Sequence, residues 1–258
     1  MFEIAYTMHR GRQNLHQEDC ILVNGALYQE CVLPVAALSL AADEVLLAVA
    51  DGVHSSPMPH RASRTVLEEL TQAIRQHPEW LQEGFVANRH LRQVQERLAD
   101  RLAVRPQTFG TASTIAVAHI RGQRAAILNV GDSRVYHSNG EGQWQRLSKD
   151  HTVLQGMIDK GQALPDTVYS SMYMMLEHVL CADHEENDFA IHRIMVPLMS
   201  DDRLVLCSDG IHDEIGEETM WTLFDPSLDV KAQTKIWRDA VWRHGAKDNL
   251  SLVVVVIE

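Results

Sequence analysis

Cysteine is scarce in this chain, and its spacing carries no zinc or redox signature. The four cysteines, Cys20, Cys31, Cys181 and Cys207, include no C-x-x-C pair, and the fourteen histidines include no H-x-x-x-H or H-E-x-x-H pair. Zinc sites and dithiol centres usually place ligands at such short spacings. We therefore expect no zinc site, and we interpret the thiols as reduced and mostly buried.

Positive charge and long apolar runs are also in short supply. With 23 lysines and arginines against 35 acids, the formal net charge is −12. Such a chain does not attract nucleic acid or an anionic membrane by charge alone. The longest apolar region, residues 32–50, is interrupted by Asp43 and Glu44, and no basic segment precedes an apolar one at the N-terminus. We expect a soluble, cytoplasmic protein with neither a nucleic-acid nor a membrane partner.

Repeats and low-complexity tracts are absent, which predicts a single domain over residues 1–258. Short apolar, β-branched runs predict strands at residues 21–23, 45–50, 113–120, 124–130, 134–137, 189–196, 203–208 and 250–257. Turns such as Arg121-Gly122-Gln123 between consecutive strands imply antiparallel pairing. The run 253–257 lacks alternation, which indicates a central strand covered on both faces.

Helical spacing of apolar residues predicts helices between these strands. The segments are 59–77, 83–103, 153–161, 217–224 and 231–244. Ser55 and Ser56 are expected to cap the first of them. Helices grouped between sets of hairpins predict an α+β fold, with helices packed outside antiparallel sheets.

Carboxylates stand beside several of the predicted strands. The segments are Glu18-Asp19, Asp51-Gly52, Asp132, Asp209-Gly210 and Asp248-Asn249. Any one of them reads equally well as an ordinary turn. Hard divalent cations, however, need several carboxylate oxygens from separate segments, and glycine allows a backbone carbonyl to approach an ion closely. Their accumulation therefore indicates a Mg²⁺ or Mn²⁺ site, with turn formation as the alternative.

Ordered motifs along nearly the whole chain carry a family resemblance. They are Glu18-Asp19, Ala50-Asp51-Gly52, Phe109-Gly110-Thr111-Ala112, Gly131-Asp132-Ser133-Arg134-Val135-Tyr136, Leu147-Ser148-Lys149-Asp150-His151, Leu206-Cys207-Ser208-Asp209-Gly210 and Asp248-Asn249. In order and spacing the chain resembles the metal-dependent protein phosphatases, the type 2C serine/threonine phosphatases, in their bacterial form. The resemblance implies a four-layer α-β-β-α sandwich, with two antiparallel sheets flanked by helices.

The resemblance also implies a centre that holds two Mn²⁺ or Mg²⁺ ions. By position, Asp51 would bridge the two ions and act as a catalytic residue, and the Gly52 carbonyl would contact one ion. Asp209 and Asp248 would complete the shell of the other ion.

The remaining acids would serve the second ion and a weaker third site. Glu18 and Asp19 would bind the second ion directly or through water, and Asp132 would form the third site with Asp209. The implied reaction is hydrolysis of phosphoserine and phosphothreonine monoesters on proteins by a water or hydroxide that bridges the two ions. The substrates would be phosphorylated by a partner serine/threonine kinase, and the enzyme would act as a monomer.

Two positions depart from the family pattern. The phosphate-binding arginine of the family corresponds here to Asn14, so we expect nearby Arg12 to take that role; the alternative is a solvated arginine near the terminus. Where bacterial relatives carry Asp-Gly-Met-Gly-Gly-His, the loop here reads Asp51-Gly52-Val53-His54-Ser55-Ser56. His54 suits a general acid for the leaving oxygen, and the alternative is an exposed loop histidine.

Residues 156–188 correspond to the variable flap that the family keeps beside its active site. Met172, Met174 and Met175 lie within it and suit a surface that adapts to protein substrates. Packing of the flap onto the body is the alternative interpretation.

Two other functions stay open at this stage. A pseudophosphatase would keep the fold as a regulatory binding module, which the altered loop favours and the complete set of carboxylates disfavours. A metal-dependent nuclease or phosphodiesterase is disfavoured by the net charge of −12.

Overall fold

The structure is a computed structural model, and it describes residues 1–77, 84–165, 167–185 and 188–258. One antiparallel sheet, sheet A, has the strand order β10-β9-β13-β14-β1-β4. Its strands are β1 (Phe2–His9), β4 (Val32–Leu40), β9 (Arg134–Ser138), β10 (Trp144–Arg146), β13 (Arg203–Cys207) and β14 (Leu250–Ile257). Strand β14 lies between β13 and β1 and is buried along almost its whole length, as its unalternating sequence predicts.

A second antiparallel sheet, sheet B, has the order β12-β8-β7-β5-β2-β3. Its strands are β2 (Cys20–Val23), β3 (Ala26–Tyr28), β5 (Glu44–Ala50), β7 (Ile115–Arg121), β8 (Arg124–Val130) and β12 (His192–Pro197). A short pair joins β6 (Ala112–Ser113) to β11 (Leu180–Cys181).

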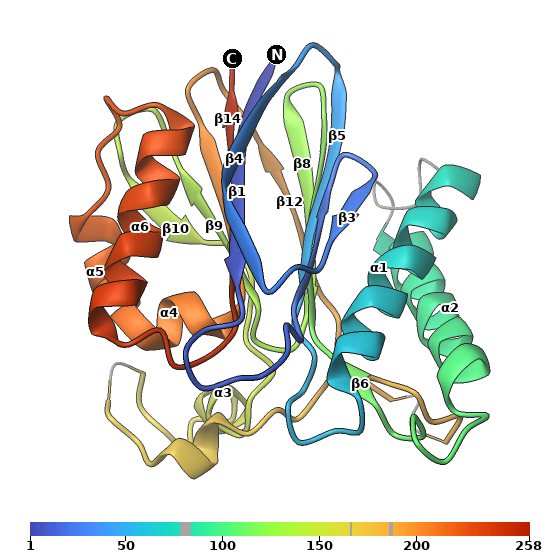
Figure 1. Ribbon diagram of the computed structural model, residues 1–258. Coiled ribbons are helices and arrows are strands. Elements are labelled where there is room, and N and C mark those ends of the chain that lie inside the picture. The colour runs from blue at the N-terminus through green and yellow to red at the C-terminus, as the bar shows by residue number, and fades with distance from the viewer. Residues whose placement is uncertain (78–83, 166, 186–187) are drawn as a thin grey trace.

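Helices cover the outer faces of both sheets (Figure 1). Helices α1 (Pro59–Gln76) and α2 (Gly84–Leu102) lie on sheet B. On sheet A lie α4 (Asp209–Ile215), α5 (Glu217–Thr222) and α6 (Val230–His244). The short helix α3 (Val153–Asp159) and the 3₁₀ helix η2 (Ser171–Met174) lie beyond the strand ends. Within the described ranges, no helix combines the length and apolarity that crossing a bilayer requires.

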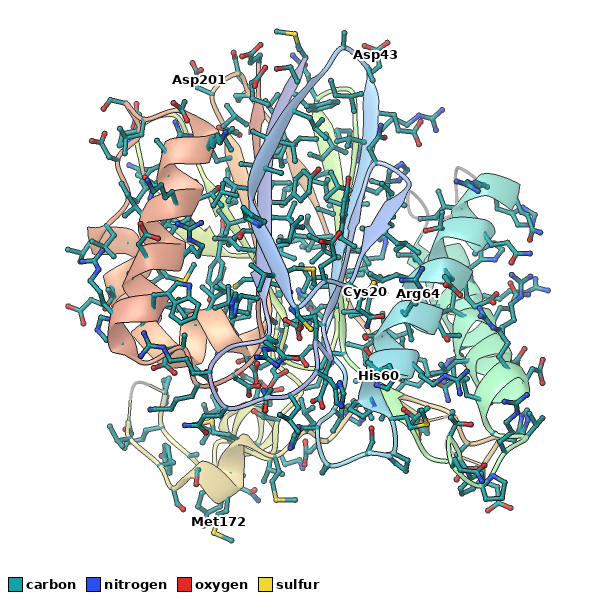
Figure 2. All side chains as sticks on the ribbon, viewed as in Figure 1. Cys20, Asp43, His60, Arg64, Met172 and Asp201 are labelled. Atoms are coloured by element: carbon teal, nitrogen blue, oxygen red, sulfur yellow. The ribbon has the colours of Figure 1, made fainter. Side chains whose placement is uncertain are left out.

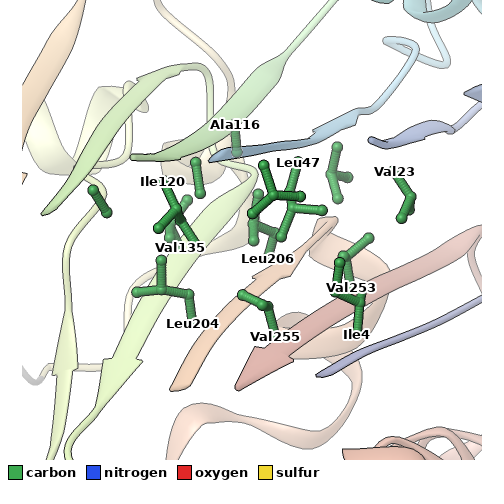
Figure 3. Close-up of a cluster of buried hydrophobic side chains, with 14 of the residues drawn as sticks. Ile4, Val23, Leu47, Ala116, Ile120, Val135, Leu204, Leu206, Val253 and Val255 are labelled. Atoms are coloured by element: carbon green, nitrogen blue, oxygen red, sulfur yellow. The ribbon is translucent and has the colours of Figure 1, made fainter. Parts of the chain in front are cut away.

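Three hydrophobic clusters hold these layers together. The middle cluster lies between the sheets, where Ile4 and Leu206 of sheet A face Leu47 and Ile120 of sheet B (Figure 3). The other two clusters pack α1 and α2 onto sheet B and α4–α6 onto sheet A, the latter around the fully buried Trp237. The resulting order of layers confirms the predicted four-layer α+β sandwich.

The structure corrects the sequence prediction at a few elements. The elements that the sequence does not predict are β1, β3, β4, β10, β11, α4 and the 3₁₀ helix η2. The expected caps of α1, Ser55 and Ser56, do not cap it: the N-cap is Met58 in the left-handed conformation, without a side-chain cap. Residue 83, where the second helix was predicted to begin, and residues 166 and 186–187 of the predicted flap lie outside the described residues.

The acidic segments gather at one end of the sandwich. Asp51 follows β5, Asp132 follows β8, Asp209 follows β13, and Asp19 and Asp248 precede β2 and β14. Antiparallel pairing brings these ends together, since Cys20 pairs with Ala50 and Cys207 with Leu252. In Figure 2 Met172 lies at this end, whereas Asp43 and Asp201 mark the opposite end.

Candidate active site

A pocket of about 330 Å³ opens at this end of the sandwich. Its walls include most of the predicted site residues, namely Glu18, Asp51, Gly52, His54, Asp132, Asp209 and Asp248. Met174 and Met175 of the predicted flap also line it. In the part of the chain that the structure describes, no lysine or arginine is among the lining residues. The structure therefore brings five carboxylates around one cavity, and His54 is the one basic side chain among the lining residues that the structure describes.

The environment of these carboxyl groups disfavours their charged forms. Removal from water raises the pKa values of Asp51, Asp132 and Asp209, and the charges of neighbouring aspartates raise them further. The carboxyl groups of Asp51 and Asp209 lie close enough to share a hydrogen bond. A cation that binds such carboxyl groups displaces the protons that they hold, because metal ligands must be deprotonated.

Backbone contacts set the direction of Asp51. The Thr114 N–H donates to the Asp51 carbonyl over 2.8 Å, and the Asp51 N–H donates to Thr114 Oγ1 over 3.1 Å. Next in the chain, the Gly52 N–H donates to the Glu18 carbonyl over 3.2 Å. A Cβ at Gly52 would lie 2.5 Å from the Pro59 carbonyl oxygen, so no other residue fits there without movement.

Glu18 is held in place by side chains from distant segments. Asn249 Oδ1 accepts from the Glu18 N–H over 2.5 Å, and Ser63 Oγ donates to the Glu18 carbonyl over 2.5 Å. Asn249 Nδ2 also donates to the carbonyls of Arg10 and His16, which fastens the whole 10–18 loop beside Asp248. Sequence reasoning quoted Asn249 within a motif but did not foresee this clamp.

Asp19 lies behind the pocket wall and is fully buried. Its Oδ2 accepts from Ser208 Oγ over 2.8 Å, while its Oδ1 makes no hydrogen bond of normal geometry within the described residues. Burial raises the pKa of Asp19 to about 7, and the nearby hydroxyls of Ser251 and Ser208 partly oppose this rise. A buried carboxylate oxygen without a donor is suited to a cation or to a water that a cation orders.

The loop that carries Asp132 is braced by two histidines that the sequence prediction missed. The Gly131 N–H donates to His151 Nδ1 over 3.1 Å, and His212 Nε2 donates to the Asp132 carbonyl over 3.1 Å. Gly131 has a φ of +93° and lies against Thr114, where a Cβ would come within 2.6 Å of Cγ2. The Asp-His motif at 150–151 was the sequence signal for one brace; nothing in the sequence marked His212.

The structure places Arg12 outside the pocket. Its guanidinium stacks over the Trp242 ring at 4.8 Å, and its Nη2 donates to the Trp242 carbonyl over 3.3 Å. Asn14 lies nearer the cavity, because its Nδ2 donates to Asp248 Oδ1 over 2.6 Å. Contact between Arg12 and a phosphate would require the guanidinium to leave Trp242, and the predicted role stays a prediction.

His54 lies at the rim of the pocket. Its Nδ1 is 2.8 Å from Glu18 Oε2, and its side chain is 74% exposed. The hydrogen bond and charge of Glu18 raise the pKa of His54. The ring at the edge of the acidic cavity is therefore more easily protonated than a free imidazole.

The donor set fits hard divalent cations. It consists of carboxylates from separate segments, which is the ligand chemistry of Mg²⁺ and Mn²⁺. Across residues 1–77, 84–165, 167–185 and 188–258, no three His, Cys, Asp or Glu side chains are grouped as a metal-holding cluster. The acids thus line a shared wall without converging on one point.

Comparison with known proteins agrees with this geometry. The family model for protein phosphatase 2C matches residues 34–249. The serine/threonine protein phosphatase PstP of Mycobacterium tuberculosis is 27% identical over 219 residues, which are 84% of this chain and 41% of that protein. The chain thus spans less than half the length of this relative. The serine/threonine phosphatase stp of Listeria welshimeri is 20% identical over 249 residues, which are 95% of this chain and 92% of that protein.

Solved structures show the same fold. The catalytic domain of PstP in complex with two manganese ions superposes with a TM-score of 0.74 at 22% identity, and the match covers 100% of both chains. The family match extends over most of the chain and includes the strand ends that carry Asp51, Asp132, Asp209 and Asp248. The chain therefore belongs to the protein phosphatase 2C family.

Proposed function

We propose that this chain is a single catalytic domain that hydrolyses phosphoserine and phosphothreonine monoesters on proteins, with Mn²⁺ or Mg²⁺ as cofactor. The observation that carries the proposal is the pocket lined by five carboxylates and, within the described chain, by no lysine or arginine. Phosphate esters are anionic, and such a pocket accepts one only when cations neutralise its walls. The substrates would be proteins phosphorylated by a serine/threonine kinase.

Each acid has a proposed part in holding the ions. Asp51 would bridge the two ions and the Gly52 carbonyl would contact one of them, while Asp209 and Asp248, which line the same pocket, would complete the shell of the other ion. Glu18 would serve the second ion directly and Asp19 from behind, through water. Asp132 with Asp209 would provide the third, weaker site.

Bound ions would supply positive charge opposite the phosphoryl oxygens and a water acidic enough to attack phosphorus near neutral pH. The chain's own groups supply orientation and a proton. The Thr114 contacts and the Asn249 clamp fix Asp51 and Glu18 before substrate arrives. His54, whose pKa is raised by its pairing with Glu18, lies at the rim and would give a proton to the leaving serine or threonine oxygen.

The proposal is tested by turnover of a phosphothreonine peptide and of 4-nitrophenyl phosphate, with Mn²⁺, with Mg²⁺ and with EDTA. We expect hydrolysis of both with either ion and none with EDTA. Absence of turnover with every metal would overturn the proposal of an enzyme and would favour the pseudophosphatase alternative. Cleavage of a phosphodiester without monoesterase activity would favour the nuclease.

His54→Gln tests the proton donor separately. A threonine alkoxide needs a proton to leave, whereas 4-nitrophenolate leaves without one, so we expect kcat to fall about 10²-fold on the peptide and little on the aryl ester. Steady-state kinetics on both substrates measure this difference. His16→Gln, in the neighbouring loop and exposed, is the matched control. Equal losses on the two substrates would assign His54 to binding rather than to proton transfer.

A further inference from the structure

Helix α6 carries a concentration of positive charge on an otherwise acidic protein. Lys231, Lys235 and Arg238 follow one another at spacings of four and three residues, which places them on one face of the helix. Both lysines are exposed. The helix contains a single acid, Asp239, which Arg238 already contacts over 2.6 Å. The chain as a whole has a net charge of −12, so this face is a local reversal of sign.

The positive charge continues beyond the helix through the loop that follows β1. Arg12 stacks over Trp242, one turn beyond Arg238, and His9 meets the same indole edge-to-face at 4.7 Å. Burial lowers the pKa of His9, and the charges of Arg10 and Arg238 lower it further, which shows that both arginines lie near this ring. We call Lys231, Lys235, Arg238, Arg10 and Arg12 the basic strip.

The basic strip ends at the mouth of the catalytic pocket. The Arg12 N–H donates to the Ala246 carbonyl over 2.7 Å, which ties the loop to the segment after α6. Two residues later, Asn14 donates to Asp248, a residue of the pocket wall. Figure 1 shows α6 running along the outside of sheet A, with the loop after β1 crossing at the end of the molecule where the strand-end turns gather.

The length of the strip suits a short stretch of polypeptide. Lys231 and Trp242 are eleven positions apart on one helix, or roughly 17 Å along its axis at about 1.5 Å per residue. An extended chain covers that distance in about five residues. Opposite charges along such a stretch raise the association rate and set the register of binding.

We propose that the basic strip binds an acidic stretch of the phosphorylated protein while its phosphoserine or phosphothreonine occupies the pocket. This inference rests on the proposed function, and it gives Arg12 a part in substrate docking in place of a contact with the reacting phosphate. An acidic polypeptide is favoured over a nucleic acid because the strip leads into a pocket built for a phosphate monoester. A longer polyanion would also extend over the acidic remainder of the surface.

The test uses Lys231→Glu/Lys235→Glu against a control with the same change in net charge, Arg75→Glu/Arg124→Glu. The control residues are exposed and lie on α1 and at the start of β8, away from α6. The ligands are labelled phosphothreonine peptides with five glutamates or five glutamines placed on either side of the phosphoresidue. Affinity is measured by fluorescence anisotropy, and turnover of the peptides and of 4-nitrophenyl phosphate is measured separately.

We expect the wild-type protein to prefer a glutamate peptide, and the Lys231/Lys235 variant to bind it about three- to ten-fold more weakly. Added salt should shrink this difference, while the control variant and turnover of 4-nitrophenyl phosphate stay unchanged. The proposal would be overturned if the wild-type protein bound neither glutamate peptide more tightly than the matching glutamine peptide. It would also be overturned if the control variant lost as much affinity as the Lys231/Lys235 variant. If the Lys231/Lys235 variant lost binding to a labelled single-stranded oligonucleotide but bound the peptides as the wild type does, the strip would be a nucleic-acid site instead.

Because fluorescence anisotropy measures peptide binding without any turnover, the proposed phosphatase activity and the proposed role of the basic strip can be disproved independently. Absence of turnover with every metal would overturn the proposed function, and the peptide affinities would still decide whether the strip recognises acidic chains. Normal turnover with no glutamate preference would overturn the strip alone.

Discussion

Asp51→Asn is expected to lower kcat on 4-nitrophenyl phosphate in Mn²⁺ by at least about 10³-fold. Asp51 lines the acidic pocket, and its carboxyl group shares a hydrogen bond with that of Asp209. Asparagine keeps the size and the backbone contacts to Thr114 but removes the charge that would face two cations at once. No neighbouring acid takes over this position, because the others already occupy their own parts of the wall.

The same substitution should leave the fold intact. Without metal, Asp51 is buried among other carboxylates that raise its pKa, and an asparagine there is neutral and can still donate a hydrogen bond to Asp209. We expect the thermal midpoint in EDTA to stay the same or to rise, while the stabilisation by Mn²⁺ is largely lost. Asp43→Asn, at the opposite end of the sandwich, is the control (Figure 2). Full activity of Asp51→Asn would remove the metal assignment, and unfolding in EDTA would show a structural role instead.

The strand ends that carry the acids were predictable from the sequence because each follows or precedes a compact β-branched run. Strand β8 has the predicted bounds, and β14 also agrees, since uninterrupted valines suit a strand buried on both faces. Whether apolar and polar residues alternate along a strand is a local property of the sequence, and the folded structure shows the burial that it predicts. The acidic segments follow directly, because a turn must stand where a strand stops.

Strand β1 and helix α4 show two different reasons for failure. In β1 the alternation Phe2, Ile4, Tyr6 and Met8 was present, but the segment was considered only as a signal peptide. Helix α4 has seven residues and begins at an Asp-Gly pair that is typical of a turn. So short a helix gains its stability from packing, here of Ile211 and Ile215 against sheet A, which no local pattern reveals.

Side-chain partners far apart in the sequence were beyond prediction. Arg12 and Trp242 are 230 residues apart, and Asn249 reaches Glu18 across 231. Spacing along the chain assigned Arg12 to phosphate because it was the nearest arginine; only the folded chain shows an indole beside it. Likewise, the sequence groups Glu18 with Asp19, whereas in the segment before β2 Glu18 lines the pocket and Asp19 is buried and not among the lining residues.

Removal of divalent ions should destabilise the protein most at alkaline pH. Burial raises the pKa of Asp19 from 3.8 to about 7, and the pKa values of Asp51 and Asp132 are raised well above their usual range. An acid whose pKa is higher in the folded state binds protons more tightly there. The stability that such an acid adds to the folded state is fully present below its unfolded pKa, and it is lost as pH rises through its folded pKa. Metal-free stability should therefore decline as pH rises through about 7.

One buried histidine acts in the opposite direction at lower pH. Burial lowers the pKa of His151 to about 4, so the unfolded state binds the extra proton between this value and the usual 6.5, and stability rises with pH there. The comparison is therefore cleanest between about pH 6.5 and pH 8.5, above the titration of an unperturbed histidine.

Divalent ions should remove or reverse this decline, because they bind the deprotonated carboxylates and only in the folded state. At an ion concentration a hundred times the dissociation constant, such binding adds about 2.7 kcal/mol to the free energy of unfolding, and the dissociation constant itself falls as protons leave the site.

Thermal unfolding followed by circular dichroism, with Mn²⁺ or with EDTA at the two pH values, measures the effect. The gain from Mn²⁺ should be larger at pH 8.5 than at about pH 6.5. In Asp51→Asn this difference should shrink, because the variant lacks both a titrating carboxyl group and the central ligand. Metal-free stability that rises between the two pH values would instead mean that these carboxylates are stabilised by groups other than cations.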